Sequence, residues 1–224
     1  MAGVLYVVAT PIGNLEDVTL RALRLLREVD LIAAEDTRHT RILLARHAIP
    51  TPTTSYYEQN KWRKGPQLLQ LLQGGKRIAL VTDAGTPGIS DPGSHLVRLA
   101  REAEIPVVPI PGPSAVAAAL SVSGAAADRF VFEGFLPARP GRRLARLREL
   151  KGMERTVVCY EGPHRLLETL EAVGEIFGEV ECVCCRELTK QFEEIRCGTP
   201  SALAAYYRER GVRGEFTLVI PARP

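Results

Sequence analysis

Long apolar runs and regular cysteine spacing are both missing from this sequence. No apolar stretch approaches the ~18 residues of a membrane-spanning helix, and the mean hydropathy is −0.01. The first residues, MAGVLYVVATP, have no basic segment and run directly into a strand-like pattern, so we expect a core strand there and not a signal peptide. Five cysteines are an odd number, which suits a reducing compartment better than a disulfide framework. The sequence therefore predicts a cytoplasmic protein.

Several nucleotide-binding and catalytic fingerprints are also absent. There is no GxxxxGK[ST] motif, no GxGxxG after the first strand-like segment and no GxSxG elbow. The four histidines form no metal-ligand spacing with cysteine or aspartate, so we expect no metal. The CVCC run at residues 182–185 lies in a strand-like segment, where neighbouring thiols alternate between faces; we expect buried structural cysteines.

Short apolar runs alternate with helical patterns along the chain, which indicates an α/β fold with largely parallel sheets. The expected strands are 5–9, 31–34, 78–82, 106–110, 130–133, 156–160, 179–186 and 216–220. The expected helices are 19–29, 67–73, 96–104, 165–176 and 201–210, the second ending at Gly74-Gly75. Three prolines in PIPGPSA interrupt the pattern, and we place the boundary between two lobes there, 1–112 and 113–224.

Three segments rich in glycine and proline each follow an expected strand: ATPIGNL (9–15), TDAGTPGISDPG (82–93) and PIPGPSA (109–115). Ligands collect at the carboxyl ends of strands in α/β sheets. Glycine lets a backbone approach a ligand, and proline reduces the ordering entropy that binding costs. The three segments together predict a ligand pocket.

Acidic residues end two of the expected strands. Asp36 opens EDTRHT and is interpreted either as a helix N-cap or as a functional carboxylate. Asp83 is interpreted either as a turn residue or as a ligand contact. Asp91 precedes Pro92 and is expected to cap the next helix. The charged segment 185–194 is either a surface turn or a substrate loop.

Basic residues are concentrated between Arg139 and Arg155, a segment that contains seven basic and two acidic residues. Such clustering favours binding to the phosphate backbone of a nucleic acid. The same segment carries Leu144, Leu147 and Leu150 at helical spacing, as expected for a solvated amphipathic helix. The two interpretations are compatible.

The sequence resembles the tetrapyrrole methylase superfamily, the two-domain class of S-adenosylmethionine-dependent methyltransferases, from Leu5 to about Ile220. The motifs that carry the resemblance are LYVVATPIGNLEDVTLRAL, AEDTRHT, TDAGTPGISDPG, PGPSA, FEGFLP, YEGPHR and RELTK. The resemblance implies a two-lobed class III methyltransferase fold with a mainly parallel sheet in each lobe. It also implies that the second lobe completes a cofactor cleft begun by the loops of the first.

The resemblance is greatest to members of the superfamily that act on ribosomal RNA. It implies 2'-O-methylation of a cytidine ribose in the decoding region of 16S rRNA within the 30S subunit, by a homodimer with S-adenosyl-L-methionine as cofactor. The implied cofactor contacts are Pro11, Gly13, Asp83, Gly85, Thr86, Pro87, Ile89, Ser114, Ala115, Tyr160 and Glu161. Many tetrapyrrole-acting members carry Asp where this chain has Thr86, which disfavours a porphyrin substrate.

A ribose hydroxyl is a weak nucleophile at pH 7, so a general base is expected near the cleft. The candidates are Asp36, Asp83, Glu161 and Lys190. The residues expected to hold RNA phosphates are Arg38, Arg139, Arg142, Arg143, Arg146 and Arg165. Two alternatives stay open, a methyltransferase of this fold that acts on a tetrapyrrole or other small molecule, and a non-enzymatic RNA-binding assembly factor.

Overall fold

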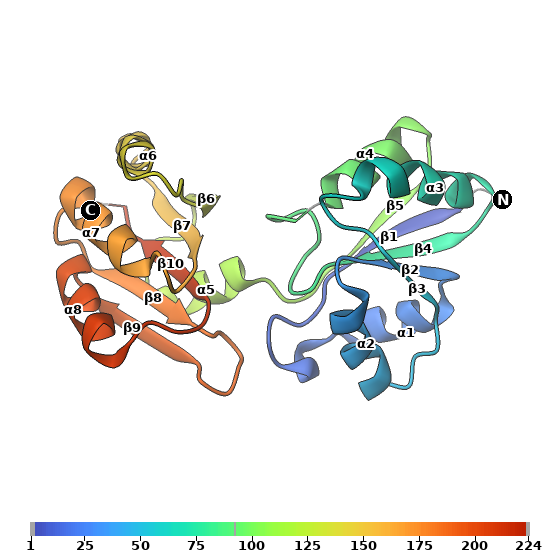
Figure 1. The fold of residues 1–224 in the computed structure, drawn as a ribbon, viewed down its shortest axis with the longest axis horizontal. Helices are drawn as coiled ribbons and strands as arrows, with labels where there is room; N and C mark the ends of the chain where they lie inside the picture. Colours follow the sequence, from blue (N-terminus) through green and yellow to red (C-terminus); the bar gives the residue numbers. More distant parts are fainter. Residues whose placement is uncertain (1–2, 92, 223–224) are drawn as a thin grey trace. The chain divides into compact units, whose positions relative to one another are not determined.

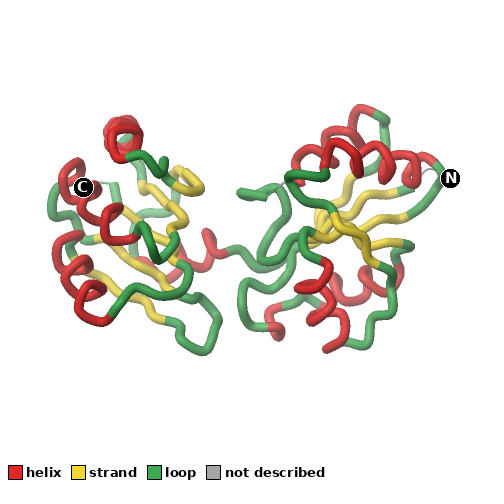
Figure 2. Tube along the Cα trace, viewed as in Figure 1, coloured by secondary structure: helices red, strands yellow, loops and turns green. Residues whose placement is uncertain are grey.

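Strands and helices alternate through both halves of the chain (Figures 1 and 2). The structure, a computed structural model, describes residues 3–91 and 93–222. Pro92, the expected first helical residue after the Asp91 cap, lies outside the described residues. The chain divides into two compact units, Met1–Ser114 and Ala115–Pro224, whereas the sequence placed the boundary after residue 112.

The first unit is a five-stranded sheet with helices on both faces (Figure 1). Its strands are β1 (Val4–Val8), β2 (Leu31–Ala34), β3 (Thr53–Ser55), β4 (Arg77–Val81) and β5 (Val107–Ile110). Its helices are η1 (Leu15–Asp17), α1 (Leu20–Glu28), α2 (Thr37–Arg46), α3 (Lys61–Gln73) and α4 (Gly93–Glu102). The strand order is β3-β2-β4-β1-β5, and every pairing is parallel.

Consecutive residues of the central strand β4 pack against opposite helix layers. Ala79 and Val81 join the core that contains α1 and α2, and Ile78 and Leu80 join the core that contains α3 and α4. All four are at most 2% exposed. A parallel sheet covered on both faces needs such continuous apolar strands, and this is why the sequence pattern identified the fold class correctly.

The second unit has a mixed sheet. Its strands are β6 (Phe130–Phe135), β7 (Thr156–Glu161), β8 (Cys182–Arg186), β9 (Glu194–Gly198) and β10 (Phe216–Ile220), in the order β6-β7-β10-β8-β9. Its helices are α5 (Ala115–Ser123), α6 (Pro140–Gly152), α7 (Leu166–Phe177) and α8 (Pro200–Arg210). Only the β6–β7 pairing is parallel, and the other three are antiparallel.

The prediction of a mainly parallel sheet in this unit is therefore wrong. Strand β10 runs antiparallel to both β7 and β8, and β9 runs antiparallel to β8. Strand β9 carries mixed charged and apolar residues and was not identified as a strand. The charged segment 185–194 includes the turn of a β8–β9 hairpin, with Glu187 and Thr189 at positive φ. A hairpin connection makes neighbouring strands antiparallel.

Cysteine burial follows the sequence expectation. Cys182, Cys184 and Cys185 are at most 1% exposed in β8, whose two faces are both covered. Burial raises the pKa of the Cys182 thiol to about 12 and that of Cys185 to about 11. The thiols stay protonated at neutral pH and pack as small apolar groups, so the prediction of buried structural cysteines is confirmed.

No helix among residues 3–91 and 93–222 has the length and apolar character needed to cross a membrane.

Candidate functional site

The carboxyl ends of the five parallel strands stand in one row. Ala34 at the end of β2 pairs with Ser55 of β3 and with Val81 of β4, and Val8 at the end of β1 pairs with Ile110 of β5. The segments that follow these residues therefore emerge along the same edge of the sheet. This edge gathers all three loops that the sequence identified, together with Glu35-Asp36 and Tyr56.

A two-way backbone bridge ties the first loop to the second. Thr10 N–H donates to the Gly85 carbonyl at 2.9 Å, and Gly85 N–H donates to the Thr10 carbonyl at 3.0 Å. The Thr10 hydroxyl adds a bond of 3.0 Å to the carbonyl of Thr82. Thr86 Oγ1 donates to the Pro113 carbonyl at 3.4 Å, which attaches the third loop. The three loops thus form one connected structure within the first unit.

Gly85 sits at φ +82°, a conformation that costs a residue with a side chain strain energy. A Cβ there would meet Ile12 Cγ2 at 3.5 Å, an ordinary contact, so the cost of a substitution is conformational. We expect Gly85→Ala to lower the free energy of unfolding by about 1–2 kcal/mol. Urea denaturation measures this, with Gly141→Ala as control, since a Cβ at Gly141 meets nothing within 4 Å. Equal stability of the two variants would contradict the role of the left-handed conformation.

Four acidic side chains gather at this edge: Glu35, Asp36, Asp83 and Asp91. Glu35 accepts the Thr82 hydroxyl at 2.6 Å, and Asp83 Oδ1 accepts the backbone N–H of Asp36 at 3.0 Å. Burial, followed by the negative charge of Glu35, raises the pKa of Asp83 above its ordinary value. A partly buried carboxylate with a raised pKa is a better proton acceptor than an exposed one.

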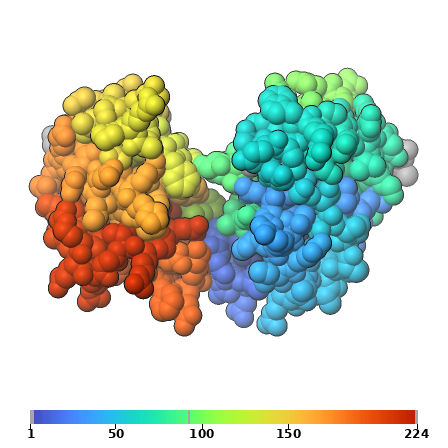
Figure 3. Space-filling view, in the orientation of Figure 1, coloured from blue at the N-terminus to red at the C-terminus, as the bar shows by residue number. Residues whose placement is uncertain are grey.

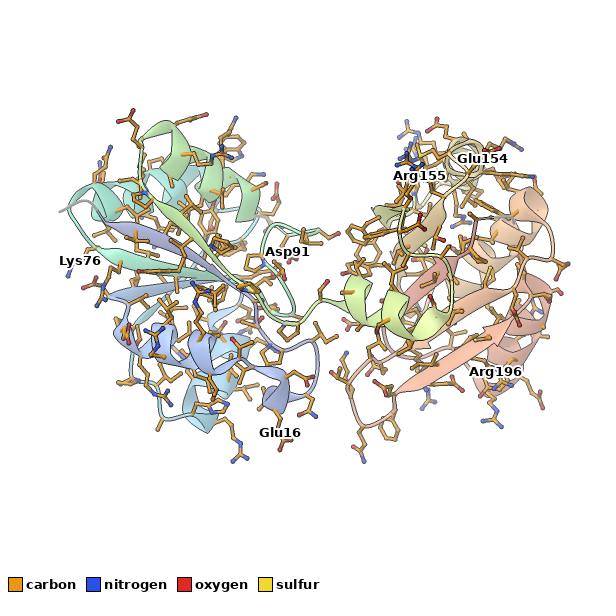
Figure 4. The ribbon with its side chains drawn as sticks, turned by 180° about the vertical axis from the view of Figure 1, so that it is seen from behind. Glu16, Lys76, Asp91, Glu154, Arg155 and Arg196 are labelled. Atoms are coloured by element: carbon orange, nitrogen blue, oxygen red, sulfur yellow. The ribbon has the colours of Figure 1, made fainter. Side chains whose placement is uncertain are left out.

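Asp91 lies in the loop that precedes α4 (Figure 4). Burial raises its pKa to about 6, and the negative charges of Glu35 and Asp83 add to this effect, while a hydrogen bond with Thr82 opposes it. The sequence treated Asp91 as a helix cap and missed its membership of the acidic cluster. The one sequence feature that indicates this membership is that Asp91 belongs to the same glycine-rich loop as Asp83.

The raised pKa of Asp91 makes stability depend on pH. The unfolded chain ionises Asp91 near 3.8 and the folded protein near 6, so the folded state loses relative stability as pH rises between these values. Asp91→Asn removes this loss, and we expect the variant to gain about 1–3 kcal/mol over the parent at pH 7 and nothing at pH 3. Denaturation midpoints at the two pH values measure the difference. An equal effect of the substitution at both would contradict the assignment.

Asp36 has a capping role. Its Oδ1 accepts the backbone N–H of Arg38 at 2.8 Å, which confirms the N-cap interpretation for α2. The Arg38 guanidinium also donates to the carboxylate and lowers the pKa of Asp36 to about 2. Such a carboxylate is a weak base. Arg38 itself is 86% exposed.

In the second unit, Glu161 ends β7 and is surrounded by donors. Its carboxylate accepts Arg165 Nε at 2.7 Å, the Thr169 hydroxyl at 2.7 Å and the Gly162 N–H at 2.9 Å. The Glu161 side chain has no exposed surface. These bonds join the end of β7 to the start of α7, so Glu161 organises the YEGPHR loop.

Aromatic rings line the neighbouring part of this loop. Tyr160 packs edge-on against Phe132 and Phe135, with ring centroids 4.9 and 5.8 Å apart, and the Arg165 guanidinium lies 6.0 Å from the Phe135 centroid. Phe135 is 58% exposed. Two aromatic rings therefore flank the predicted contact Tyr160, and a cation lies beside one of these rings.

Lys190 belongs to the β8–β9 turn. Its ammonium donates to Glu187 at 3.0 Å and to Glu215 at 2.7 Å. Burial would lower the pKa of Lys190, but these two carboxylates together raise it above its ordinary value. Lys190 is therefore charged at neutral pH, which makes it a poor proton acceptor.

The expected RNA-binding arginines of the second unit differ in accessibility. Arg139 and Arg142 are exposed at the start of α6. Arg143 is only 3% exposed and donates to Glu168 at 2.8 Å, so it is removed from the predicted phosphate contacts. Arg146 pairs with Glu133 and Glu149, and Arg165 pairs with Glu161. Arg143 is buried because it lies one turn before Leu147 on the apolar side of α6. Counting basic residues along the sequence does not show this position.

The remaining predicted cofactor contacts lie within the three loops already described. Pro11, Gly85 and Pro87 are buried, Gly13 is exposed and Ile89 is 44% exposed. Ser114 ends the first unit and Ala115 begins α5. Within residues 3–91 and 93–222, no three His, Cys, Asp or Glu side chains are arranged to hold a metal ion.

Comparison with known sequences identifies the family. Residues 4–204 match the model of the tetrapyrrole (corrin/porphyrin) methylases. The chain belongs to the tetrapyrrole methylase family. Relatives named ribosomal RNA small subunit methyltransferase I include one from Synechocystis sp., 53% identical over 97% of this chain and 78% of the relative. Another, from Bacillus subtilis, is 47% identical over 97% of this chain and 75% of the relative.

Solved structures of family members show the same fold. Uroporphyrin-III C-methyltransferase from Thermus thermophilus, complexed with S-adenosylhomocysteine, superposes with a TM-score of 0.67 at 18% identity and covers 97% of both chains. A cobalt-precorrin-4 methyltransferase superposes with a TM-score of 0.71 at 18% identity, over 98% of this chain and 96% of the other. The predicted two-lobed α/β fold is thereby confirmed.

Proposed function

We propose that this family member transfers a methyl group from S-adenosyl-L-methionine to the ribose 2'-oxygen of a cytidine in the decoding region of 16S rRNA. The observation that carries the proposal is identity of 47–54% to small-subunit rRNA methyltransferases along 87–100% of the chain. Identity to the tetrapyrrole methyltransferases of the same fold is only 17–20%. The small-molecule alternative is therefore the weaker one.

The loops of the first unit fit the proposed cofactor. Gly85 and Gly88 both have positive φ, a conformation that favours glycine. Because glycine has no side chain, a ligand can approach the backbone closely at these two positions. Ile89 exposes 44% of its surface beside them, which suits an apolar contact with an adenosyl group. We propose that Pro11, Gly13, the segment from Gly85 to Ile89, and Ser114 hold the cofactor in the first unit. The contacts at Ala115 and Tyr160 stay predictions from the sequence.

S-adenosylmethionine supplies an electrophilic methyl group on a sulfonium ion. The chain must bring the ribose oxygen in line behind that methyl group, and good positioning contributes up to about 7–11 kcal/mol to such reactions. Among the four candidate bases, Asp83 fits best, because its pKa is raised while that of Asp36 is lowered. Glu161 is enclosed by its own donors, and Lys190 is held as a cation. We propose that Asp83 accepts the proton of the 2'-hydroxyl.

The exposed arginines at the start of α6 predict how strongly RNA binding depends on salt concentration. Each phosphate of a single strand that is neutralised contributes about 0.7 to the slope of log K against log salt concentration. We expect Arg139→Ala combined with Arg142→Ala to reduce the slope by about 1.4. Binding of 30S particles at several salt concentrations measures it. Arg208→Ala, an exposed arginine paired with Glu171, is the control, and an equal change in slope for the control would contradict the assignment.

Incubation of unmethylated 30S particles with labelled cofactor tests the function. We expect label in 16S rRNA with 30S particles and none with uroporphyrinogen. Label in the tetrapyrrole alone would support the small-molecule alternative, and binding of RNA without any transfer would support the assembly-factor alternative. We further propose a cytoplasmic homodimer, and light scattering of the purified chain tests its oligomeric state.

A further inference from the structure

Trp62, the only tryptophan in the chain, is exposed. It lies in the first turn of α3 and exposes 67% of its surface. An indole left in water contributes little to the core, because the hydrophobic effect scales with the area removed from water. Its contribution to the fold is therefore small, and the features around it need another explanation.

The exposed Trp62 ring packs against a buried histidine. Trp62 and His95 pack edge-on, with ring centroids 4.6 Å apart and an interplanar angle of 67°. His95 is 8% exposed, and its Nδ1 shares a hydrogen bond of 3.0 Å with the hydroxyl of Tyr56, which is 1% exposed. A Cβ at Gly65 would lie 2.9 Å from His95 Cε1, so the glycine leaves room for the imidazole. A buried support therefore fixes an exposed aromatic face.

Basic residues neighbour this aromatic face in the sequence, and one of them contacts the ring. The segment YEQNKWRK, residues 57–64, contains three basic residues and one acid. Lys61 Nζ lies 5.3 Å from the Trp62 centroid and is paired with Glu58, whereas Arg63 is exposed. Tyr57, 38% exposed, adds a second aromatic ring. Cations interleaved with exposed aromatic rings are the combination that binds single-stranded nucleic acid, through phosphate contacts and base stacking.

The aromatic segment also shares its edge with the proposed catalytic carboxylate. Tyr56 follows Ser55, which pairs with Ala34, and Ala34 pairs with Val81, which Thr82 and Asp83 follow. Two strand spacings separate β3 from β4, roughly 10 Å. The α3 segment, teal in Figure 3, forms part of the visible surface of the first unit. An RNA strand that places a ribose at Asp83 thus has Trp62 within reach along the same edge.

We infer that Trp62 is a stacking platform for an unpaired base of the RNA substrate beside the methylated nucleotide, with the exposed Arg63 against the backbone. The inference rests on the proposed function, because it assigns a surface to the same substrate. Trp62 is a positioning residue: it holds the strand and takes no part in the proton or methyl transfer.

The fluorescence of Trp62 reports stacking directly, since no other tryptophan contributes. The probe is a single-stranded RNA oligonucleotide with the sequence of the decoding region of 16S rRNA. We expect it to quench the emission, and we expect the same sequence annealed into a duplex to quench it far less. Unchanged emission under conditions in which the oligonucleotide binds would overturn the inference.

Variants separate stacking from folding. We expect Trp62→Ala to raise KM for 30S particles about 5- to 150-fold, the effect of one lost base stack, with kcat and calorimetric cofactor affinity unchanged. Trp62→Phe keeps an aromatic face and should recover most of the loss. Leu71→Ala, on the same helix with 41% exposure, should leave KM unchanged.

The outcomes distinguish this inference from the proposed function. If the enzyme methylates 16S rRNA and Trp62→Ala has the parental KM, the inference is wrong and the function stands. If the enzyme neither binds nor methylates RNA, both are wrong. If Trp62→Ala weakens 30S binding but the oligonucleotide causes no quenching, the surface contacts a ribosomal protein and the stacking role is excluded.

Discussion

Replacing Asp83 with asparagine is expected to lower kcat for rRNA methylation by a factor on the order of 10²–10⁴, the usual contribution of a general base. Asparagine keeps an oxygen that can accept the Asp36 N–H, a bond of 3.0 Å in the parent, so the loop should stay in place. The change therefore removes basicity and leaves the local hydrogen bond. Single-turnover kinetics with 30S particles measures the loss.

Cofactor affinity and pH dependence identify the role of Asp83. Because burial raises the pKa of Asp83, the parent enzyme should lose activity as pH falls through that raised value, and Asp83→Asn should lack this acidic limb. Calorimetry should show an unchanged affinity for S-adenosylmethionine. Asp128→Asn, at an exposed position of the second unit, is the control. A normal kcat for Asp83→Asn, or a loss explained by weaker cofactor binding, would contradict the assignment.

Replacing Glu161 with alanine is expected to destabilise the protein by roughly 2–4 kcal/mol, because it leaves buried donors without their acceptor. The Thr169 hydroxyl, in a residue with no exposed surface, loses its 2.7 Å bond. The Gly162 N–H and the Arg165 guanidinium lose theirs at the same time. The midpoint of urea denaturation at pH 7 measures the effect.

An exposed ion pair provides the matched comparison. Glu149 is 61% exposed and accepts Arg146 Nη1 at 2.6 Å. Because water screens an exposed pair, Glu149→Ala should cost at most about 1 kcal/mol. If Glu161→Ala unfolds at the parental midpoint and loses only kcat, then Glu161 is a catalytic group and its structural role is refuted.

The sequence predicted four of the five strands of the first unit because their signals are local, and it missed β3 and the length of α2. Continuous apolar strands, the Gly74-Gly75 stop of α3 and the Asp36 cap each depend on a few neighbouring residues. The start of α3 was missed by six residues, since Gly65-Pro66 is typical of a break, whereas the helix begins at Lys61 and includes Pro66. The β8–β9 hairpin was missed because β9 mixes charged and apolar residues. The antiparallel direction of β10 was missed because it depends on tertiary pairing with β7 and β8.

The sequence predicted which loops form the candidate site, but not which of their residues acts as the base. The position of Asp83 after β4 follows from the sequence, but the pKa shift that separates it from Asp36 depends on burial and on Glu35. Likewise, Arg143 and Arg142 are adjacent basic residues in the sequence, and only the packing of α6 against α7 buries one and exposes the other. Contacts between distant segments determine such differences.

Mapping the methyl group tests the proposed function most directly. Unmethylated 30S particles are incubated with labelled S-adenosylmethionine, the 16S rRNA is digested to nucleosides, and mass spectrometry locates the label. We predict a single labelled 2'-O-methylcytidine from the decoding region, abolished by Asp83→Asn and reduced at limiting substrate by Trp62→Ala. Label on a base, label outside the small-subunit rRNA, or no transfer at all would contradict the proposal.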